Sequence, residues 1–287
     1  MATSISEGFR LFRANLEITD LQAPVVATRQ KGVREAVESG FEVLDSFLTG
    51  SYARDTLIGP LKKADVDLFT VLSSRYYQNQ TPQGLLDQLR EHLRKTYPTT
   101  PRVSKNGQAV TITFTDFIVD VVPAFNRQGG GYLIPHANTG EWISTDPKRH
   151  IELWSEANEF HQGDLVPLIK MLKAWNRGHS ERFRSFHLEA MVVKILTNVT
   201  ISDFPSGLRF FFTKAQEATG YKLADPAGYG GDVGAYMTGT LLTETNQSLL
   251  RAEEWALEAE AAIADGRIDL AFDKYRILFG DYFPAYG

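Results

Sequence analysis

The stretch TGSYARDTLIGPLKKADVDLFTVL restricts the fold of this chain more than any other segment. An apolar run ends at Gly50 and Ser51, and a short connection leads from there into the alternating segment DVDLFTVL. Side chains two residues apart on a β-strand point to the same face, so Asp65 and Asp67 lie side by side while the apolar residues between them point away. The pattern therefore predicts a strand over residues 65–72 with one buried face and two adjacent carboxylates on the other.

Two neighbouring carboxylates need compensation. They repel each other and stay ionised only beside a cation or hydrogen-bond donors. Mg²⁺ prefers oxygen ligands and is commonly held by one or two carboxylates together with substrate phosphates. A third acid, Asp120 in the apolar run FIVDVVPAF, is costly there without a partner, and it is our candidate for completing the site. Asp116 lies four residues earlier and could share its face on a continuous strand, but we interpret it as a turn or exposed residue.

The Gly-Ser pair is explained by the same chemistry. Gly50 permits close approach of the backbone to a phosphate, and N–H groups at the start of a following helix bind anions. Ser51 adds a hydroxyl donor. A triphosphate on this turn, metal ions on the aspartates and an attacking hydroxyl near Asp120 make a two-metal nucleotidyl-transfer site.

The chain changes character near its middle. We predict strands over residues 41–49, 65–72 and 109–124, with a hairpin signal at Asn106-Gly107. Helical periodicity covers 5–17, 24–40, 82–96, 147–161, 164–177, 185–199, 206–219, 245–264 and 267–279. We therefore expect an α+β fold with two lobes and an active-site cleft between them. The boundaries are 1–160 for a lobe with a mixed sheet and helices and 161–287 for a helical lobe, with N-terminal helices that can pack on the second lobe.

Composition excludes several classes of function. The net charge of −5 argues against direct activation by long nucleic acid, which needs a basic face. There is no cysteine, which excludes disulfides and cysteine-ligated zinc. No apolar run approaches the roughly 20 residues of a membrane span, and the N-terminus lacks the pattern of a secretory signal. We expect a cytoplasmic protein without membrane attachment.

The order TGS, DVD and a distant VDVVPAF resembles the polymerase-β-like nucleotidyltransferase superfamily. Further stretches, LIKMLKAWN, SFHLEAM, ADPAG and LFGDYFP, are similar to the cGAS/DncV-like nucleotidyltransferases of bacteria, the CD-NTase family. The similarity extends over most of the chain. It implies the polymerase-β-like catalytic lobe packed on a helical C-terminal lobe.

The resemblance assigns roles in the first lobe. Gly50 and Ser51 would hold the donor triphosphate. Asp65 and Asp67 would ligate Mg²⁺, as two ions for which Mn²⁺ could substitute. Asp120 would complete the metal site and help to activate the acceptor hydroxyl, and its match to the family's position is why we prefer it to Asp116.

The resemblance also assigns roles elsewhere in the chain. Lys173 would reach the donor phosphates, Ser185 would bind the triphosphate, and Phe186 would lie near the donor base. Thr145 falls where relatives place a small polar residue near the acceptor base. Alternatives remain: Lys173 could extend along the surface of its helix towards water, Lys170 could be the phosphate contact instead, and Ser185 could be a helix N-cap.

The family implies a function and partners. The chain would make a cyclic di- or trinucleotide second messenger from nucleoside triphosphates, releasing pyrophosphate, in anti-phage (CBASS) defence. A separate effector protein would read the product, and a regulatory protein partner is possible. The alternatives are a linear oligonucleotide synthase or RNA-end nucleotidyltransferase with the same core, and a non-catalytic nucleotide-binding regulator.

Overall fold

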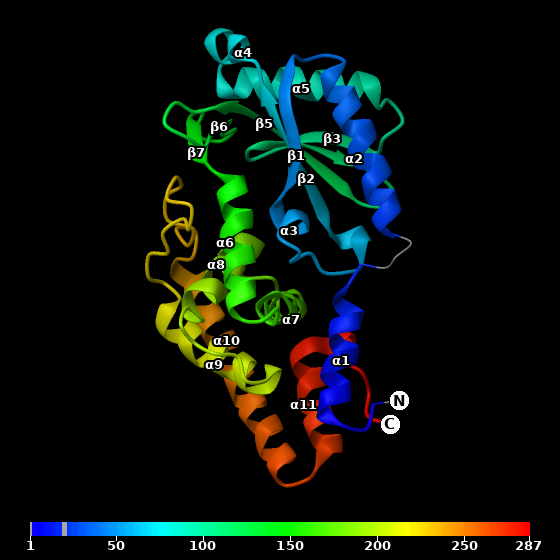
Figure 1. The fold of residues 1–287 in the computed structure, drawn as a ribbon, viewed down its shortest axis with the longest axis vertical. Helices are drawn as coiled ribbons and strands as arrows, with labels where there is room; N and C mark the ends of the chain where they lie inside the picture. Colours follow the sequence, from blue (N-terminus) through cyan, green and yellow to red (C-terminus); the bar gives the residue numbers. More distant parts are fainter. Residues whose placement is uncertain (1, 19–21) are drawn as a thin grey trace. The chain divides into compact units, whose positions relative to one another are not determined.

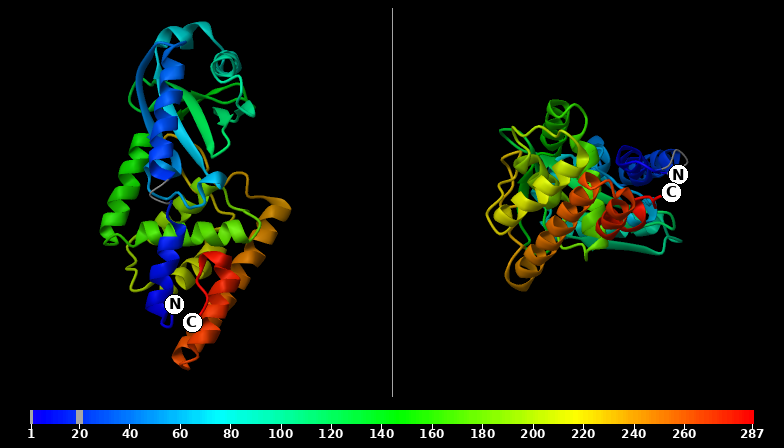
Figure 2. Two further views of the ribbon diagram at one scale, coloured as in Figure 1. Left: turned by 90° about the vertical axis from the view of Figure 1, so that its right-hand side faces the viewer. Right: turned by 90° about the horizontal axis from the view of Figure 1, so that it is seen from below.

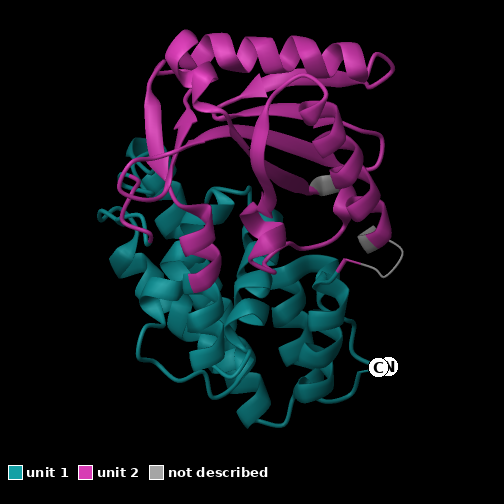
Figure 3. Cartoon of the chain, turned by 45° about the horizontal axis from the view of Figure 1, so that its top comes forward, with its two compact units in different colours: residues 1–17, 153–226, 231–287 teal, residues 18–152, 227–230 magenta. Residues whose placement is uncertain are grey.

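The computed structural model describes residues 2–18 and 22–287, without the side chains of residues 22, 23 and 63. Its path through helices and strands can be followed in Figure 1. The chain forms two compact units, which are coloured separately in Figure 3 and described here one at a time. Unit 1 comprises residues 1–17, 153–226 and 231–287, and unit 2 comprises residues 18–152 and 227–230.

Unit 2 is built on a seven-stranded mixed sheet. Five strands follow the order β1-β2-β5-β4-β3, with β6 paired to β5 and β7 paired to β6. The β2–β5 pair is parallel, and the other pairs are antiparallel. The mixed sheet confirms the predicted fold class. The strands are β1 (Val43–Thr49), β2 (Asp65–Leu72), β3 (Arg102–Asn106), β4 (Ala109–Thr113), β5 (Ile118–Asn126), β6 (Tyr132–Pro135) and β7 (Trp142–Thr145).

The continuous strand predicted over residues 109–124 is wrong. Strand β4 ends at Thr113 and β5 begins at Ile118, and a turn between them is closed by the Phe114 N–H, which donates to the Phe117 carbonyl. The two strands pair with each other as antiparallel neighbours. An apolar run with β-branched residues on both sides of a short turn looks like one strand, because propensity does not report where the chain reverses.

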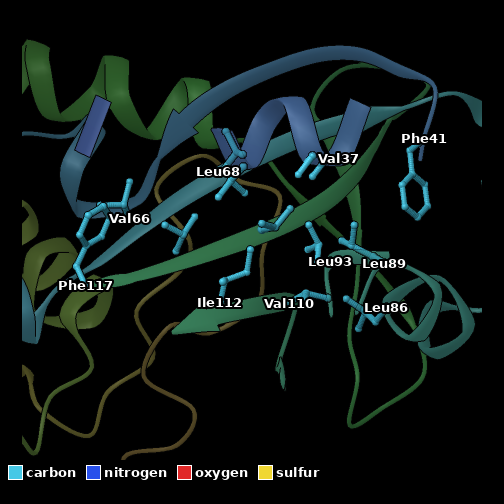
Figure 4. Close-up of a cluster of buried hydrophobic side chains, with 14 of the residues drawn as sticks. Val37, Phe41, Val66, Leu68, Leu86, Leu89, Leu93, Val110, Ile112 and Phe117 are labelled. Atoms are coloured by element: carbon cyan, nitrogen blue, oxygen red, sulfur yellow. The ribbon is translucent and has the colours of Figure 1, made fainter. Parts of the chain in front are cut away.

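Helices cover the apolar face of this sheet. The helices α2 (Gln22–Glu38) and α5 (Pro82–Thr96) contribute to one core with β2, β4 and β5 (Figure 4). The start of α5 is specified by sequence, because Thr81 caps it by accepting a hydrogen bond from the Gly84 N–H and Pro82 occupies the first turn. Two short helices, α3 (Gly50–Ala53) and α4 (Ser74–Asn79), and a 3-10 turn, η1 (Leu61–Lys63), complete the unit.

Unit 1 is helical. Its first helix packs on its last one, where Phe9 and Phe12 meet an aromatic cluster that includes Tyr275, Phe279 and Phe283. Helices α10 (Gly239–Ala264) and α11 (Ile268–Phe279) run side by side in both views of Figure 2, and the chain ends lie together. The helices are α1 (Ile5–Leu16), α7 (Leu165–Gly178), α8 (Ser185–Ile195), α9 (Phe204–Ala218), α10 (Gly239–Ala264) and α11 (Ile268–Phe279), followed by the 3-10 turn η2 (Gly280–Tyr282).

The division between the units differs from the predicted boundary at residue 160. Helix α6 (Pro147–Phe160) crosses it, so the helical unit starts at Leu153 and not after residue 160. Helix α1 belongs to the helical unit, in line with the expectation that N-terminal helices can pack on the second lobe, and α2 contributes to the core of unit 2. The sequence of a continuous helix carries no local signal of where along it the chain passes from one unit to the other. Among the described residues, no helix is long and apolar enough to cross a membrane.

Candidate active site

The carboxylates predicted from sequence meet on two neighbouring strands. In the parallel pairing of β2 with β5, Asp67 lies opposite Asp120, and Asp65 lies two residues earlier on β2. The side chains that alternate with them, such as Val66 and Val121, are fully buried in the core. The acids are therefore on the opposite face of the sheet, so three carboxylates from distant parts of the sequence share one area.

Asp120 is the most buried of the three acids. Asp120 is 8% exposed, whereas Asp65 is exposed and Asp67 is half-buried. Burial raises the pKa of the Asp120 carboxyl above its usual value; a hydrogen bond from Thr111 opposes this shift, and the charge of Asp65 adds to it. The Thr111 hydroxyl donates to Asp120 Oδ1 at 2.5 Å from the facing position on β4. The carboxylate is thus held in one orientation and is more basic than an ordinary aspartate.

Asp116 is excluded from this group. It lies in the turn before β5, so it cannot share a strand face with Asp120. Its Oδ2 accepts hydrogen bonds from the Arg29 guanidinium at 3.3 and 3.4 Å, and its Oδ1 accepts one from the Phe117 N–H. Its interpretation as a turn residue is confirmed.

The donor set suits a divalent cation. Three aspartate carboxylates form an all-oxygen set of the kind that Mg²⁺ takes, and the mutual repulsion of Asp65 and Asp120 would be relieved by a positive ion. Within residues 2–18 and 22–287, no three His, Asp or Glu side chains are gathered closely enough to form a ligand cage. The register places the three carboxylates on one face, and in sites where Mg²⁺ is held by carboxylates, substrate phosphates supply further ligands.

Gly50 is required by the geometry of Asp67. The backbone of Gly50 has φ +65°, a left-handed conformation that L-residues rarely adopt. A Cβ at this position would overlap the carboxylate of Asp67, which lies against it. Thr49, directly before it, pairs with Asp67 across the β1–β2 ladder. The glycine is what lets the turn approach the acidic strand.

Ser51 lies in the short helix α3, which starts at Gly50. The first N–H groups of a helix have no partner within the helix, and here Thr49 makes no side-chain capping bond to them. The carbonyl of Ser51 accepts the Thr56 N–H at 2.8 Å, which closes the turn from the other side. The amides of the Gly50-Ser51 turn are suited to bind phosphate oxygens beside the carboxylates.

Thr145 lies on the carboxylate face of unit 2. It pairs directly with Tyr132 across the β6–β7 ladder, so the two side chains point to the same side. The Tyr132 ring packs edge-on against Phe69, with centroids 5.1 Å apart, and Phe69 follows Asp67 by two residues on the same face of β2. The position predicted for a base contact is therefore on the side of the sheet that carries the acids.

The remaining predicted residues belong to unit 1. Ser185 is the first residue of α8 and is exposed, while Arg184 holds the N-cap position with no side-chain capping bond. The alternative that Ser185 serves as the N-cap is therefore wrong. Phe186 is half-buried and stacks on the buried Trp154, with ring centroids 5.8 Å apart and an interplanar angle of 19°.

Lys173 is buried in a salt bridge. Its ammonium donates to Glu189 Oε1 at 3.0 Å, and the two side chains are 8% and 0% exposed. Glu189 lies four residues after Ser185, on the same face of α8, so Lys173 and Ser185 are drawn to one side of this helix. Lys170 is also buried and donates to Glu17. The alternative that Lys173 extends into water is wrong, and contact with phosphate would have to share or replace Glu189.

The sequence did not indicate two residues that contact these sites, Thr111 and Tyr236. Thr111 orients Asp120, but only the β4–β5 register reveals this, since a threonine in a strand carries no such signal. Tyr236 contacts the start of α8 from a glycine-rich segment, where the Arg184 N–H donates to its hydroxyl oxygen. An unexplained aromatic residue in that segment was the available signal.

Chemistry on a nucleoside triphosphate requires a phosphate-binding turn next to carboxylates that can hold metal ions. Unit 2 has a glycine turn after β1 beside three carboxylates on strands β2 and β5, an arrangement of the kind found in nucleotidyltransferases. The comparisons with known proteins narrow this class. The sequence model of the Second Messenger Oligonucleotide or Dinucleotide Synthetase domain matches residues 3–158, and the chain belongs to this family, the CD-NTases.

Relatives and solved structures agree with this assignment. A cyclic AMP-AMP-AMP synthase of Acinetobacter sp. is 28% identical over 256 residues, which cover 83% of this chain and 72% of that protein. The structure of Escherichia coli CdnC in a complex with HORMA-deltaN has a TM-score of 0.76 at 20% identity and covers 96% of both chains. The structure of Bradyrhizobium diazoefficiens CdnG in complex with GTP has a TM-score of 0.76 at 14% identity, covering 98% of this chain and 96% of that one. At these identities the two structures show the shared fold.

Proposed function

We propose that this protein joins nucleoside triphosphates into a cyclic di- or trinucleotide and releases pyrophosphate. The observation that carries the proposal is the pairing of Asp67 with Asp120 beside the left-handed Gly50. ATP is the first substrate to test, because the Acinetobacter relative is named a cyclic AMP-AMP-AMP synthase. The product would be a second messenger in anti-phage defence, made in the cytoplasm and read by a separate effector.

The residues of unit 2 divide the reaction between them. The amides of Gly50 and Ser51 bind the donor triphosphate and orient its α-phosphate. Asp65, Asp67 and Asp120 would hold two Mg²⁺ ions, which supply charge neutralisation when bound. A ribose hydroxyl attacks in line, so that a new bond forms between its oxygen and the α-phosphorus while the bond to the pyrophosphate oxygen breaks.

The proton of the attacking hydroxyl leaves toward Asp120. The hydrogen bond that the Thr111 hydroxyl donates to Asp120 holds this carboxylate in one orientation, as a positioned proton acceptor requires. A second or third round of the same reaction on the linear intermediate closes the ring. Repetition requires no additional catalytic group, only that the free hydroxyl end of the intermediate occupies the acceptor position.

Other residues take supporting roles in this proposal. Ser185 and Lys173 bind the donor phosphates, and Phe186 lies beside the donor base. Thr145 contacts the acceptor base, and a threonine lacks the amide that pairs with a pyrimidine edge, which favours purines. A regulatory protein partner is part of the proposal, in view of the HORMA-deltaN chain in the CdnC complex.

Product analysis tests the proposal directly. The purified protein is incubated with four ribonucleoside triphosphates and Mg²⁺ or Mn²⁺, treated with phosphatase, and analysed by mass spectrometry. A phosphatase-resistant cyclic species supports the proposal and names its bases. Pyrophosphate release with only phosphatase-sensitive products would instead identify a linear oligonucleotide synthase. Tight triphosphate binding without pyrophosphate release, with Mn²⁺ and at high enzyme concentration, would identify a nucleotide-binding regulator.

Substitution of the acids tests the site. Asp67→Asn and Asp120→Asn are each expected to lower product formation by at least about 10²-fold, because either amide removes a charge on which the metal site depends. Asp116→Asn is the matched control, since Asp116 lies in the turn before β5 and forms a salt bridge with Arg29 of α2. It is expected to keep near wild-type turnover. Circular dichroism and thermal unfolding establish that all variants are folded, and substantial turnover by both site variants would overturn the assignment.

A further inference from the structure

The glycine-rich segment ADPAGYGGDVGAYM contains an ordered turn next to α8. Asp232 closes it, because its Oδ1 accepts hydrogen bonds from the Leu223 N–H at 3.0 Å and the Gly234 N–H at 2.9 Å. A β-bridge between Ala224 and Asp232 adds a backbone link. Acceptance of two amides by one carboxylate oxygen fixes the path of the chain from this turn to Tyr236.

Tyr236 is hydrogen-bonded to the start of α8 through its hydroxyl. The Arg184 N–H donates to the Tyr236 oxygen at 2.7 Å, and the same oxygen lies 3.0 Å from His187 Nδ1. Since the oxygen accepts from the backbone amide, its own proton is available for His187. The order of donors is then Arg184 N–H to Tyr236 and Tyr236 O–H to His187 Nδ1.

This order requires a neutral His187 with its proton on Nε2. The side chain is in a residue only 2% exposed, and burial lowers its pKa to about 4. Two charged groups modify the shift: Asp232 raises the pKa and Arg184 lowers it. A Cβ on Gly234 would lie 3.2 Å from the imidazole, so the turn is packed closely against the ring. The imidazole is therefore neutral at neutral pH, and with its proton on Nε2 its Nδ1 accepts the Tyr236 hydroxyl.

The hydroxyl acts at the residue that precedes Ser185. Arg184 is the N-cap of α8, with extended φ −65° and ψ 141°, and its guanidinium stacks over the Tyr236 ring at 4.2 Å. The Arg184 side chain makes no capping bond, and the Tyr236–Arg184 and Tyr236–His187 hydrogen bonds connect the first turn of α8 to the loop. The orientation of the exposed Ser185 hydroxyl depends on the backbone between these two anchors.

We propose that Tyr236 is a positioning residue, whose hydroxyl fixes the first turn of α8 and thereby holds Ser185 in place to bind the triphosphate of the substrate. The inference rests on the proposed function and extends it to a residue outside the phosphate site. It also gives the glycine-rich segment a role: its tight turn is what brings Tyr236 to the helix start.

Tyr236→Phe tests the hydroxyl alone, because the ring keeps its packing on Arg184 and His187. In the proposed role Ser185 contacts phosphates that are bound in both the ground state and the transition state, so its misplacement would weaken uniform binding. We expect KM for ATP to rise roughly three- to tenfold, the equivalent of one modest hydrogen bond, with kcat unchanged. Tyr221→Phe is the control: it removes a hydroxyl from a 77% exposed tyrosine at the start of the same connection and should leave both constants unchanged.

His187 gives an internal rescue test. In His187→Asn the amide oxygen stands near the position of Nδ1 and can accept from Tyr236, so KM should stay within about twofold of wild type. His187→Leu removes the acceptor and should raise KM as Tyr236→Phe does. Wild-type KM in both Tyr236→Phe and His187→Leu would overturn the inference, and so would a large loss of kcat with unchanged KM.

Imidazole ¹⁵N NMR provides a readout that needs no turnover. Wild type should show His187 protonated at Nε2, and Tyr236→Phe should change the Nδ1 shift. A proton on Nδ1 in the wild type would overturn the hydrogen-bond order and the inference with it. Failure of the proposed function is distinguishable, because it would appear as a wild type that neither binds nor converts triphosphates while the NMR result stands.

Discussion

Gly50→Ala should separate the folding role of this glycine from its role in the site. The backbone at Gly50 has φ +65°, a conformation that costs an L-residue about 1–2 kcal/mol. The added methyl group would also overlap the Asp67 carboxylate, so that carboxylate or the turn must move by on the order of 1 Å. A displacement of this size at a reacting centre costs about 10²-fold in rate. We therefore expect a modest fall in stability and a loss of turnover of at least that size.

Gly107→Ala is the matched control for this change. Gly107 has φ +58° in the β3–β4 hairpin, and no atom lies within 4 Å of the position its Cβ would take. The free energy of unfolding of Gly107→Ala, measured in urea, should fall by the same amount of about 1–2 kcal/mol, while its turnover stays at the wild-type level. Product formation for both variants is measured by mass spectrometry at one ATP concentration below KM. Near wild-type turnover of Gly50→Ala, or an equal loss in both variants, would refute the reasoning.

Lys173→Met should destabilise the protein by about 3–5 kcal/mol, because it leaves the Glu189 carboxylate buried without its cation. Lys170→Met should cost less, since the partner of Lys170 is half-exposed, and urea unfolding compares the two. Combining Lys173→Met with Glu189→Leu should recover most of the stability without recovering ATP binding; recovery of both would show that Lys173 is only structural. His187, with a pKa of about 4 in the folded state against 6.5 in the unfolded chain, binds fewer protons when folded. The contribution of His187 to the free energy of unfolding should therefore be complete above pH 6.5 and be lost as the pH drops toward 4. Urea unfolding measures this free energy as a function of pH, and the same pH dependence in the wild type and in His187→Asn would contradict the prediction.

The candidate carboxylates and the Gly-Ser turn could be picked out from the sequence because their signals are local. A DVD segment alternates with apolar residues, and a strand with period two must place both acids on one face. Gly50 and Ser51 stand at a fixed distance before them along the chain. The elements around them, including β2 over 65–72 and α5 over 82–96, matched their predicted ranges because capping and alternation are written in neighbouring residues.

Other features depended on contacts between distant residues. The chain reversal at 114–117 removed Asp116 from the strand, although its spacing to Asp120 suited a shared face. The burial of Lys173 depends on Glu189 on another helix, so the lysine looked like a surface cation in its own segment. Spacing along the chain could not report either partner.

By itself the sequence determined which residues are candidates for the chemistry, namely the acids and the Gly-Ser turn, and the elements on which they lie. These follow from covalent spacing and from the two periodicities of helix and strand. Only the tertiary structure decided that Asp67 faces Asp120, that Thr111 aims the latter, and that Tyr236 anchors α8. The physical reason is that register and packing are selected by the burial of the whole core, in which many side chains from separate segments must fit at once.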